Sequence, residues 1–497
     1  MSLPQRESAN QVPLAVTKHQ QPATGAPGRF MFTGSGKATS RLEPIILAAI
    51  GIITLSLVFG IRWQWLGDDG VYRDFANPIG QFSGSLTAFL DQRLTYWTSR
   101  AIIESAIFLV IRRLFWWRLI TALAFWVTIV VPPYLITRQS NLRIRLMLLS
   151  ALLVLTIPSA VWFSAGYVAT SVNYLWPLAA ALLAAVPAVL LVQNRKVNPR
   201  WYVLATVGAI FAANAEIVAA LLAALYVIAL AFTFFRNWIS RNSAITNINL
   251  SEGNCPTKTY PAPASFRIKR NYLVIGAFLL FSIVMLGYHL TSPGNAARRL
   301  TNWSFDPLPI IIERSYSSTL RQLFLSGYLL PLAFFAVVAY RNYRTHGLTL
   351  FTYLSLIPLA GSLLLRDGLI PGTLGATFQS LFHFGNLLWD PRDAALPLAL
   401  TPANVFAFTA LTVMLITAVI AVITANFSLP KMLVIIALLA AGFVSRFIVA
   451  NSVGEGLADL FHRTDLYMLI AFLIATLVAV AGNSFEPNPP IGHRNLN

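Results

Sequence analysis

Apolar runs, each about as long as a bilayer is thick, alternate with short polar segments along most of this chain. A helix needs about 20 apolar residues to cross a membrane. The expected spans are residues 44–61, 118–137, 143–160, 173–192, 201–214, 216–235, 271–290, 325–340, 348–365, 402–424, 431–449 and 466–482. The pattern therefore predicts an all-α fold, a polytopic transmembrane helical bundle of about 12 spans.

One apolar stretch, Trp201–Phe235, is too long for a single span. Asn214, Ala215 and Glu216 interrupt it. A carboxylate within an apolar segment must be paired, neutral or functional. We therefore expect two helices that meet at this point, with Glu216 as a candidate site residue.

The two ends of the chain are polar. Residues 1–40 are rich in Gln, Ser, Thr, Gly and Pro, which predicts a disordered tail. The expected organisation is a disordered cytoplasmic tail over 1–40, a transmembrane domain over 41–482 and a second cytoplasmic tail over 483–497. No small-residue cleavage pattern follows the first apolar run, so we expect that run to remain as an anchor.

Composition supports the membrane interpretation and narrows the function. Hydrophobic residues make up 57% of the chain and charged residues 11%, whereas soluble domains carry roughly a quarter charged residues. The formal net charge is +18, and the basic residues are scattered between the apolar runs. Basic residues in the cytoplasmic loops of a membrane protein would account for this charge. Their scatter argues against nucleic-acid binding. The single cysteine, Cys255, excludes an intramolecular disulfide.

The loop after the first span, residues 62–117, is expected on the outer face. Its segments 78–93 and 96–115 mix apolar and charged residues, which favours helices lying on the membrane rather than further spans. Arg100 and Glu104 are four positions apart, the spacing of a simple ion pair on one helix. Most of the 18 acidic residues fall in loops expected outside, which indicates either chemistry at that face or soluble loops.

Gly67-Asp68-Asp69 gives this outer loop its strongest candidate chemistry. Adjacent carboxylates at a partly apolar surface titrate together and have raised pKa values. Either Asp68 or Asp69 could then accept a proton from an attacking hydroxyl. The alternative is a solvated turn or helix cap, since Gly-Asp-Asp-Gly is also common in turns.

The other candidates are residue types that bind sugars and phosphates. Aromatic rings and amides stack on or hydrogen-bond to carbohydrate, and arginine binds phosphate. Interfacial anchoring is the alternative for the aromatic residues. Besides Glu216, the candidate substrate-binding residues are Tyr72, Arg73, Trp97, Arg100, Asn173, Tyr174, Trp176, Asn295, Arg298 and Arg299.

The order of these motifs resembles that of the GT-C superfamily of integral-membrane glycosyltransferases, and of an uncharacterised bacterial family of GT-C-like proteins. The residues that carry the resemblance are Asp68-Asp69, Trp97–Arg100, Gly166–Pro177 and Pro293-Gly294-Asn295 with Arg298. The likeness covers most of residues 44–470. It implies a GT-C fold with membrane-lying helices in the first outer loop.

The resemblance also implies a function. A sugar would pass from a polyprenyl-phosphate donor to a cell-envelope glycan or glycolipid, at the outer face of the bacterial cytoplasmic membrane, with both termini cytoplasmic. Asp68 or Asp69 would be the base. No cofactor is required, although the outer acids could bind a divalent metal, and no zinc-site spacing or nucleotide-binding Gly-rich loop is present. The rival functions are a secondary transporter and a lipid-linked glycan polymerase or ligase.

Overall fold

The fold is helical throughout the residues that a computed structural model describes. These are residues 36–62, 67–249, 265–301, 328–365, 402–453 and 458–481, with single residues and pairs between 312 and 324. No β-strand is present in that part of the chain, so the all-α prediction is confirmed. Most of the predicted N-terminal tail and all of the C-terminal tail lie outside the described residues. Helix α1 (Gly36–Phe59) begins a few residues before the predicted end of the N-terminal tail.

Five helical segments in the described part of the chain are long and apolar enough to cross a membrane. They are Leu42–Phe59 within α1, Leu114–Ile136 (α5), Tyr167–Val192, Glu216–Ile239 within α11 (Glu216–Asn249) and Asn271–Thr291 within α12 (Ser265–Thr291). The third of these combines α8 (Tyr167–Thr170), the π-helical turn η1 (Ser171–Leu175) and α9 (Trp176–Val192). The protein is therefore a membrane protein with several spans, and the count of twelve spans stays a prediction.

Helices also coincide with the other predicted spans. They are α6 (Ser140–Leu155), α10 (Pro199–Ala212), α15 (Leu329–His346), α16 (Leu350–Leu364), α19 (Pro402–Thr424), α20 (Leu429–Val453) and α21 (Ala458–Val480). The predicted interruption of the long apolar stretch is confirmed, because α10 ends at Ala212 and α11 begins at Glu216. The apolar pattern thus located the helices correctly.

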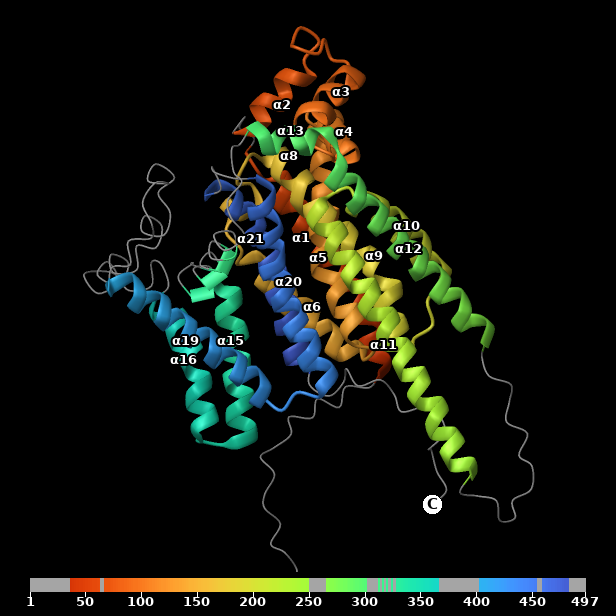
Figure 1. Ribbon diagram of the computed structural model, residues 1–497, viewed down its shortest axis with the longest axis vertical. Coiled ribbons are helices and arrows are strands. Elements are labelled where there is room, and N and C mark those ends of the chain that lie inside the picture. Colours follow the sequence, from red (N-terminus) through yellow and green to blue (C-terminus); the bar gives the residue numbers. More distant parts are fainter. Residues whose placement is uncertain are drawn as a thin grey trace, which may run out of the picture.

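Short helices gather at one end of the bundle (Figure 1). They are α2 (Asp68–Ala76), α3 (Leu86–Tyr96), α4 (Ala101–Val110), α8 and α13 (Pro293–Thr301). A helix rises 1.5 Å per residue, so the 10 residues of α4 cover about 15 Å, half of the hydrocarbon core. Helix α4 is therefore too short to cross a membrane by itself, and the placement of the segment 96–115 on the membrane surface stays a prediction.

Close packing of α9 against α10 holds the centre of the bundle. Gly208 of α10 lies against the backbone of α9, where an added Cβ would be 2.5 Å from the carbonyl oxygen of Ala180. Small residues at such contacts let membrane helices approach closely. α9 also packs on α5 and α11, and α11 packs on α12. This packing positions the helix ends that carry the polar residues described next.

Candidate functional site

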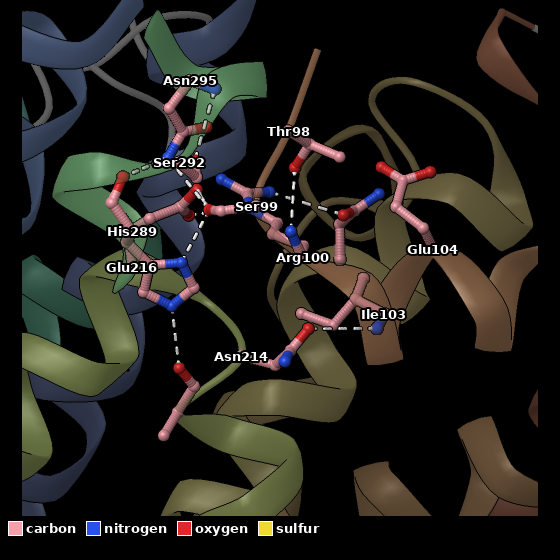
Figure 2. A network of polar contacts seen from close by, with 12 residues as sticks. Thr98, Ser99, Arg100, Ile103, Glu104, Asn214, Glu216, His289, Ser292 and Asn295 are labelled. Carbon is pink, nitrogen blue, oxygen red and sulfur yellow. Dashed lines mark hydrogen bonds and ion pairs between the residues drawn. The ribbon is translucent and has the colours of Figure 1, made fainter. Parts of the chain in front are cut away.

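Polar side chains from four segments meet at the end of the bundle that carries the short helices (Figure 2). The segments are the loop between α3 and α4, the turn between α10 and α11, the end of α12, and α13. The residues that meet are Thr98, Ser99, Arg100, Asn214, Glu216, His289, Ser292 and Asn295. The sequence interval between these segments reaches almost 200 positions, so the cluster exists only in the folded protein.

The turn between α10 and α11 organises the cluster. The Oδ1 of Asn214 accepts hydrogen bonds from the backbone N–H groups of Ile102 (2.9 Å) and Ile103 (3.4 Å). These N–H groups belong to the first turn of α4, where they lack partners within the helix. Asn214 therefore caps α4 from a distant part of the chain and brings Arg100 to Glu216.

Arg100 and Glu216 form an ion pair, with 2.7 Å between Nε and Oε2. The Nη1 of Arg100 also donates to the Oδ1 of Asn173, at 3.4 Å. Burial alone would lower the pKa of the Arg100 guanidinium, but the neighbouring Glu216 carboxylate keeps that pKa above its ordinary value. The expected pairing of Arg100 with Glu104 is wrong, because both side chains have found partners on other helices.

Glu104 pairs instead with Arg93 of α3, at 3.2 Å. The hydroxyl of Tyr72 lies between them: it accepts from Nη2 of Arg93 at 2.8 Å and donates to Oε2 of Glu104 at 3.0 Å. Burial and the Glu104 carboxylate raise the pKa of Tyr72. Tyr72 is buried in this bond network, so it ties α2 to α3 and α4 rather than presenting a surface to a ligand.

Ser99 lies at the centre of the cluster. Its hydroxyl contacts Oε1 of Glu216 (3.2 Å), Nδ1 of His289 (2.6 Å) and Nδ2 of Asn295 (2.9 Å). The Nε2 of His289 bonds to the carbonyl oxygen of Ala213, at 2.9 Å. The predicted residue Asn295 thus joins α13 to the loop before α4.

Trp97 is the exposed residue of this region, and the partly buried Arg298 lies beside its ring. The Trp97 side chain is 41% exposed, and the guanidinium carbons of Arg93 and Arg298 lie 5.4 and 5.7 Å from the centre of its ring. Burial and the neighbouring Arg100 lower the pKa of Arg298. In the described part of the chain no acidic group lies within ion-pair distance of Arg298. The side chain of the predicted residue Arg299 lies outside what the structure describes.

Asp68 and Asp69 have different environments. Asp69 is fully buried, and its carboxylate accepts from the N–H groups of Val168 (3.1 Å) and Ala169 (2.8 Å) at the start of α8. Burial raises the pKa of Asp69 to about 6, against the opposing effect of these N–H groups. Asp68 is partly exposed, and its own N–H donates to the carbonyl of Ala165 at 2.8 Å. Asp69 therefore acts as a helix cap, and Asp68 is the accessible member of the pair. The neighbouring candidate Arg73 is exposed on α2.

The remaining candidates, Asn173, Tyr174 and Trp176, lie in or directly after the π-helical turn η1. Asn173 lies in this turn and is partly exposed beside Arg100. Tyr174 is buried, and the centre of its ring lies 6.3 Å from the centre of the Tyr467 ring. Trp176 is buried as well, and its Nε1 donates to Thr121 at 3.0 Å. The turn thus presents Asn173 to the cluster and directs the two aromatic rings into the core. The sugar-stacking role predicted for Tyr174 and Trp176 does not fit their burial.

Sequence reasoning did not select seven members of the two networks: Arg93, Thr98, Ser99, Glu104, Asn214, His289 and Ser292. Ser99 and His289 were adjacent to selected segments, and Asn214 lay in the predicted interruption. Their partners lie on helices far away in the sequence, so no local sequence pattern indicates these contacts. In the residues that the structure describes, no group of three or more His, Cys, Asp or Glu side chains could hold a metal ion.

No protein-family model, curated protein or solved structure matches this chain.

Proposed function

We propose that this membrane protein is a glycosyltransferase of GT-C type that uses a polyprenyl-phosphate-linked sugar as its donor and a cell-envelope glycan or glycolipid as its acceptor. The reaction would take place at the end of the bundle that carries α2, α3, α4 and α13. The observation that carries the proposal is the pairing of an exposed Trp97 with Arg298, whose charge has no acidic partner among the described residues.

This arrangement suits a donor with a phosphate leaving group. Arg298 can bind a phosphate oxygen, and the ring of Trp97 offers a flat surface for a sugar. Arg100 is already neutralised by Glu216, so Arg298 supplies the uncompensated positive charge. Charge placed where the leaving phosphate develops its own charge lowers the barrier without any covalent step.

The base in this proposal is Asp68. An acceptor hydroxyl must lose its proton as its oxygen attacks the sugar, and a partly exposed carboxylate can take that proton. Asp69 is fully buried, and N–H groups of α8 occupy its oxygen atoms. Of the two acids left open by the sequence, Asp68 is therefore the better candidate.

The test of the base measures sugar transfer by purified protein in detergent. The donors are a panel of polyprenyl-phosphate sugars and the acceptor is crude membrane glycolipid. Asp68→Asn is expected to lower the rate roughly 100- to 10,000-fold, the usual contribution of a general base. The matched control, Asp74→Asn, removes an exposed carboxylate on the same helix and should keep the wild-type rate. Equal rates in the two variants would remove Asp68 from the mechanism.

The phosphate site is tested separately by donor binding. Arg298→Gln is expected to weaken the binding of polyprenyl phosphate about tenfold, equivalent to about 1.4 kcal/mol. Arg112→Gln, which removes an exposed arginine between α4 and α5, serves as the control. Wild-type protein that transfers no sugar from any donor, but moves a solute across vesicles, would favour the transporter instead.

A further inference from the structure

Three arginines gather near Tyr134, at the end of α5 that lies away from the short helices (Figure 1). Helix α5 starts beside α4 and runs for 23 residues, so its last turn, which holds Tyr134, is at the other end of the bundle. The guanidinium carbons of Arg143 and Arg195 lie 5.5 and 5.4 Å from the centre of the Tyr134 ring. Arg138 follows α5 directly and donates to the backbone carbonyl of Gln193 at 3.5 Å.

The end of α9 fixes Arg195 in this group. Asn194 has a φ of 54°, the left-handed conformation that ends many helices. The N–H of Asn194 bonds back to the carbonyl of Leu191 at 2.9 Å, and the N–H of Arg195 bonds back to the carbonyl of Leu190 at 2.8 Å. Backbone bonds therefore hold Arg195 close to the other arginines, although their charges repel one another.

The positive charge of this group is only partly neutralised. Arg143 pairs with Glu43 of α1, with 2.8 Å between Nε and Oε1. Among the described residues, no carboxylate lies within ion-pair distance of Arg138 or Arg195. Burial lowers the pKa of the Arg195 guanidinium, and the charges of Arg138 and Arg143 lower it further. An anion bound between Arg138 and Arg195 would relieve this repulsion.

Arg195 has N–H groups left for such an anion. Its bonds to described residues all start at Nη1, which donates to the carbonyl of Tyr134 at 3.3 Å and to Oε1 of Gln193 at 3.0 Å. A guanidinium carries five N–H groups, and two of them can bind two oxygens of one phosphate. Arg195 is partly exposed and Arg138 is exposed, so both can reach a ligand from outside the bundle.

The depth of the group in the membrane indicates the source of the anion. The apolar spans Leu114–Ile136 and Tyr167–Val192 end two and three residues before Arg138 and Arg195. Two or three residues extend over at most about 7–11 Å, and the headgroup layer is about 5–7 Å thick. The ring of Trp201 lies 5.4 Å from that of Tyr134, and such aromatic pairs are typical of this layer. The guanidinium groups therefore lie where lipid phosphates are.

We propose that Arg138 and Arg195 bind the phosphate of an anionic phospholipid between the end of α5 and the end of α9. The lipid must carry a net negative charge, because the ammonium group of a zwitterionic lipid would meet the excess of arginines over Glu43. Clefts with basic residues between membrane helices bind such headgroups. This inference does not rest on the proposed function, since Trp97 and Arg298 lie at the other end of the bundle.

The experiment measures lipid binding to the purified full chain by native mass spectrometry from a neutral detergent. Phosphatidylglycerol and phosphatidylcholine are added at equal concentrations, and phosphatidylglycerol is expected to bind more tightly. Equal binding of the two lipids to the wild-type protein would overturn the proposal. Arg138→Gln should weaken the binding of phosphatidylglycerol about fivefold, the effect of one basic residue beside an anionic headgroup. Arg138 is exposed and its bond to Gln193 is long, so this variant should fold as the wild type does.

The matched control is Arg344→Gln, which removes an exposed arginine from the last turn of α15 and changes the net charge equally. It should bind phosphatidylglycerol as the wild type does. If Arg344→Gln and Arg138→Gln weaken binding by the same factor, the lipid responds to the total charge of the protein and the proposal fails. Inorganic phosphate in large excess separates a lipid from a soluble anion. Displacement of phosphatidylglycerol by inorganic phosphate would overturn the assignment to a lipid.

Discussion

Arg100 and Glu216 lie 116 positions apart in the chain, and their side chains meet at 2.7 Å. The pair joins the start of α4 to the start of α11, and so connects the short helices to a membrane span. Only about a sixth of each side chain is exposed (15% and 17%). Loss of either partner would leave the other charge buried and uncompensated, which is far more costly than loss of an exposed ion pair.

Substitution of this pair should therefore show strong coupling. Arg100→Met and Glu216→Gln are each expected to lower the free energy of unfolding by about 3 kcal/mol. The double variant should cost less than the sum by about 1 kcal/mol or more, measured as denaturant unfolding in detergent. The control combines Arg100→Met with Glu43→Gln, since Glu43 pairs with Arg143 of α6. The changes in unfolding free energy caused by Arg100→Met and Glu43→Gln should add. If the changes caused by Arg100→Met and Glu216→Gln also add, the prediction is contradicted.

The sequence predicted the helices better than the contacts between them. The length of an apolar run is a local property, and Glu216 within one such run marked the boundary between α10 and α11. The partner of a charged residue is not local. Arg100 and Glu104 have the spacing of a helix pair, yet α3 supplies Arg93 to one and α11 supplies Glu216 to the other. Burial of Asp69 beneath the start of α8 depends on the same long-range packing.

The pKa of Asp69, raised from 3.8 to about 6, predicts a pH-dependent stability. The folded state holds the proton of Asp69 more tightly than the unfolded chain does. The stabilisation from this group is complete below pH 3.8 and is lost as the pH rises through about 6. The loss is on the order of 3 kcal/mol at neutral pH.

Asp69→Asn tests this effect because an amide oxygen can still accept from the start of α8. The melting temperature of Asp69→Asn, relative to that of the wild type in the same detergent, should rise between about pH 4 and pH 7 and then level off. Asp69→Ala removes the hydrogen bonds as well. Relative to Asp69→Asn, it should cost about 1 kcal/mol at every pH, as for other lost helix caps, because neither variant titrates. A constant difference between Asp69→Asn and the wild type across this range would show that Asp69 does not titrate there.

The hydroxyl of Tyr72 is expected to contribute to stability through Arg93 and Glu104. Tyr72→Phe keeps the buried ring and removes the hydroxyl that bonds to both charged groups. Loss of a buried hydrogen bond to charged groups costs about 1.5–3 kcal/mol, which thermal unfolding can measure. Tyr96→Phe provides the control, since Tyr96 is exposed at the end of α3. If the two variants unfold at the same temperature, the bonds of Tyr72 add nothing to the stability.

Gly294 should be essential for the docking of α13, because a Cβ there would lie 2.5 Å from the carbonyl oxygen of Thr98 and 2.6 Å from that of Leu94. Both are backbone atoms, so Gly294→Ala must move α13 away from the loop that carries Ser99 and Arg100. Overpacking of this kind costs about 1–3 kcal/mol. The bonds of Asn295 to Ser99 should weaken with it, and the binding of polyprenyl phosphate near Arg298 should fall.

The control is Gly287→Ala in α12, where no atom lies within 4 Å of the added Cβ. Gly287→Ala should unfold at or slightly above the wild-type temperature, since alanine favours helix. Equal stability and binding in the two variants would mean that the contact of α13 with residues 94–98 does not position the site.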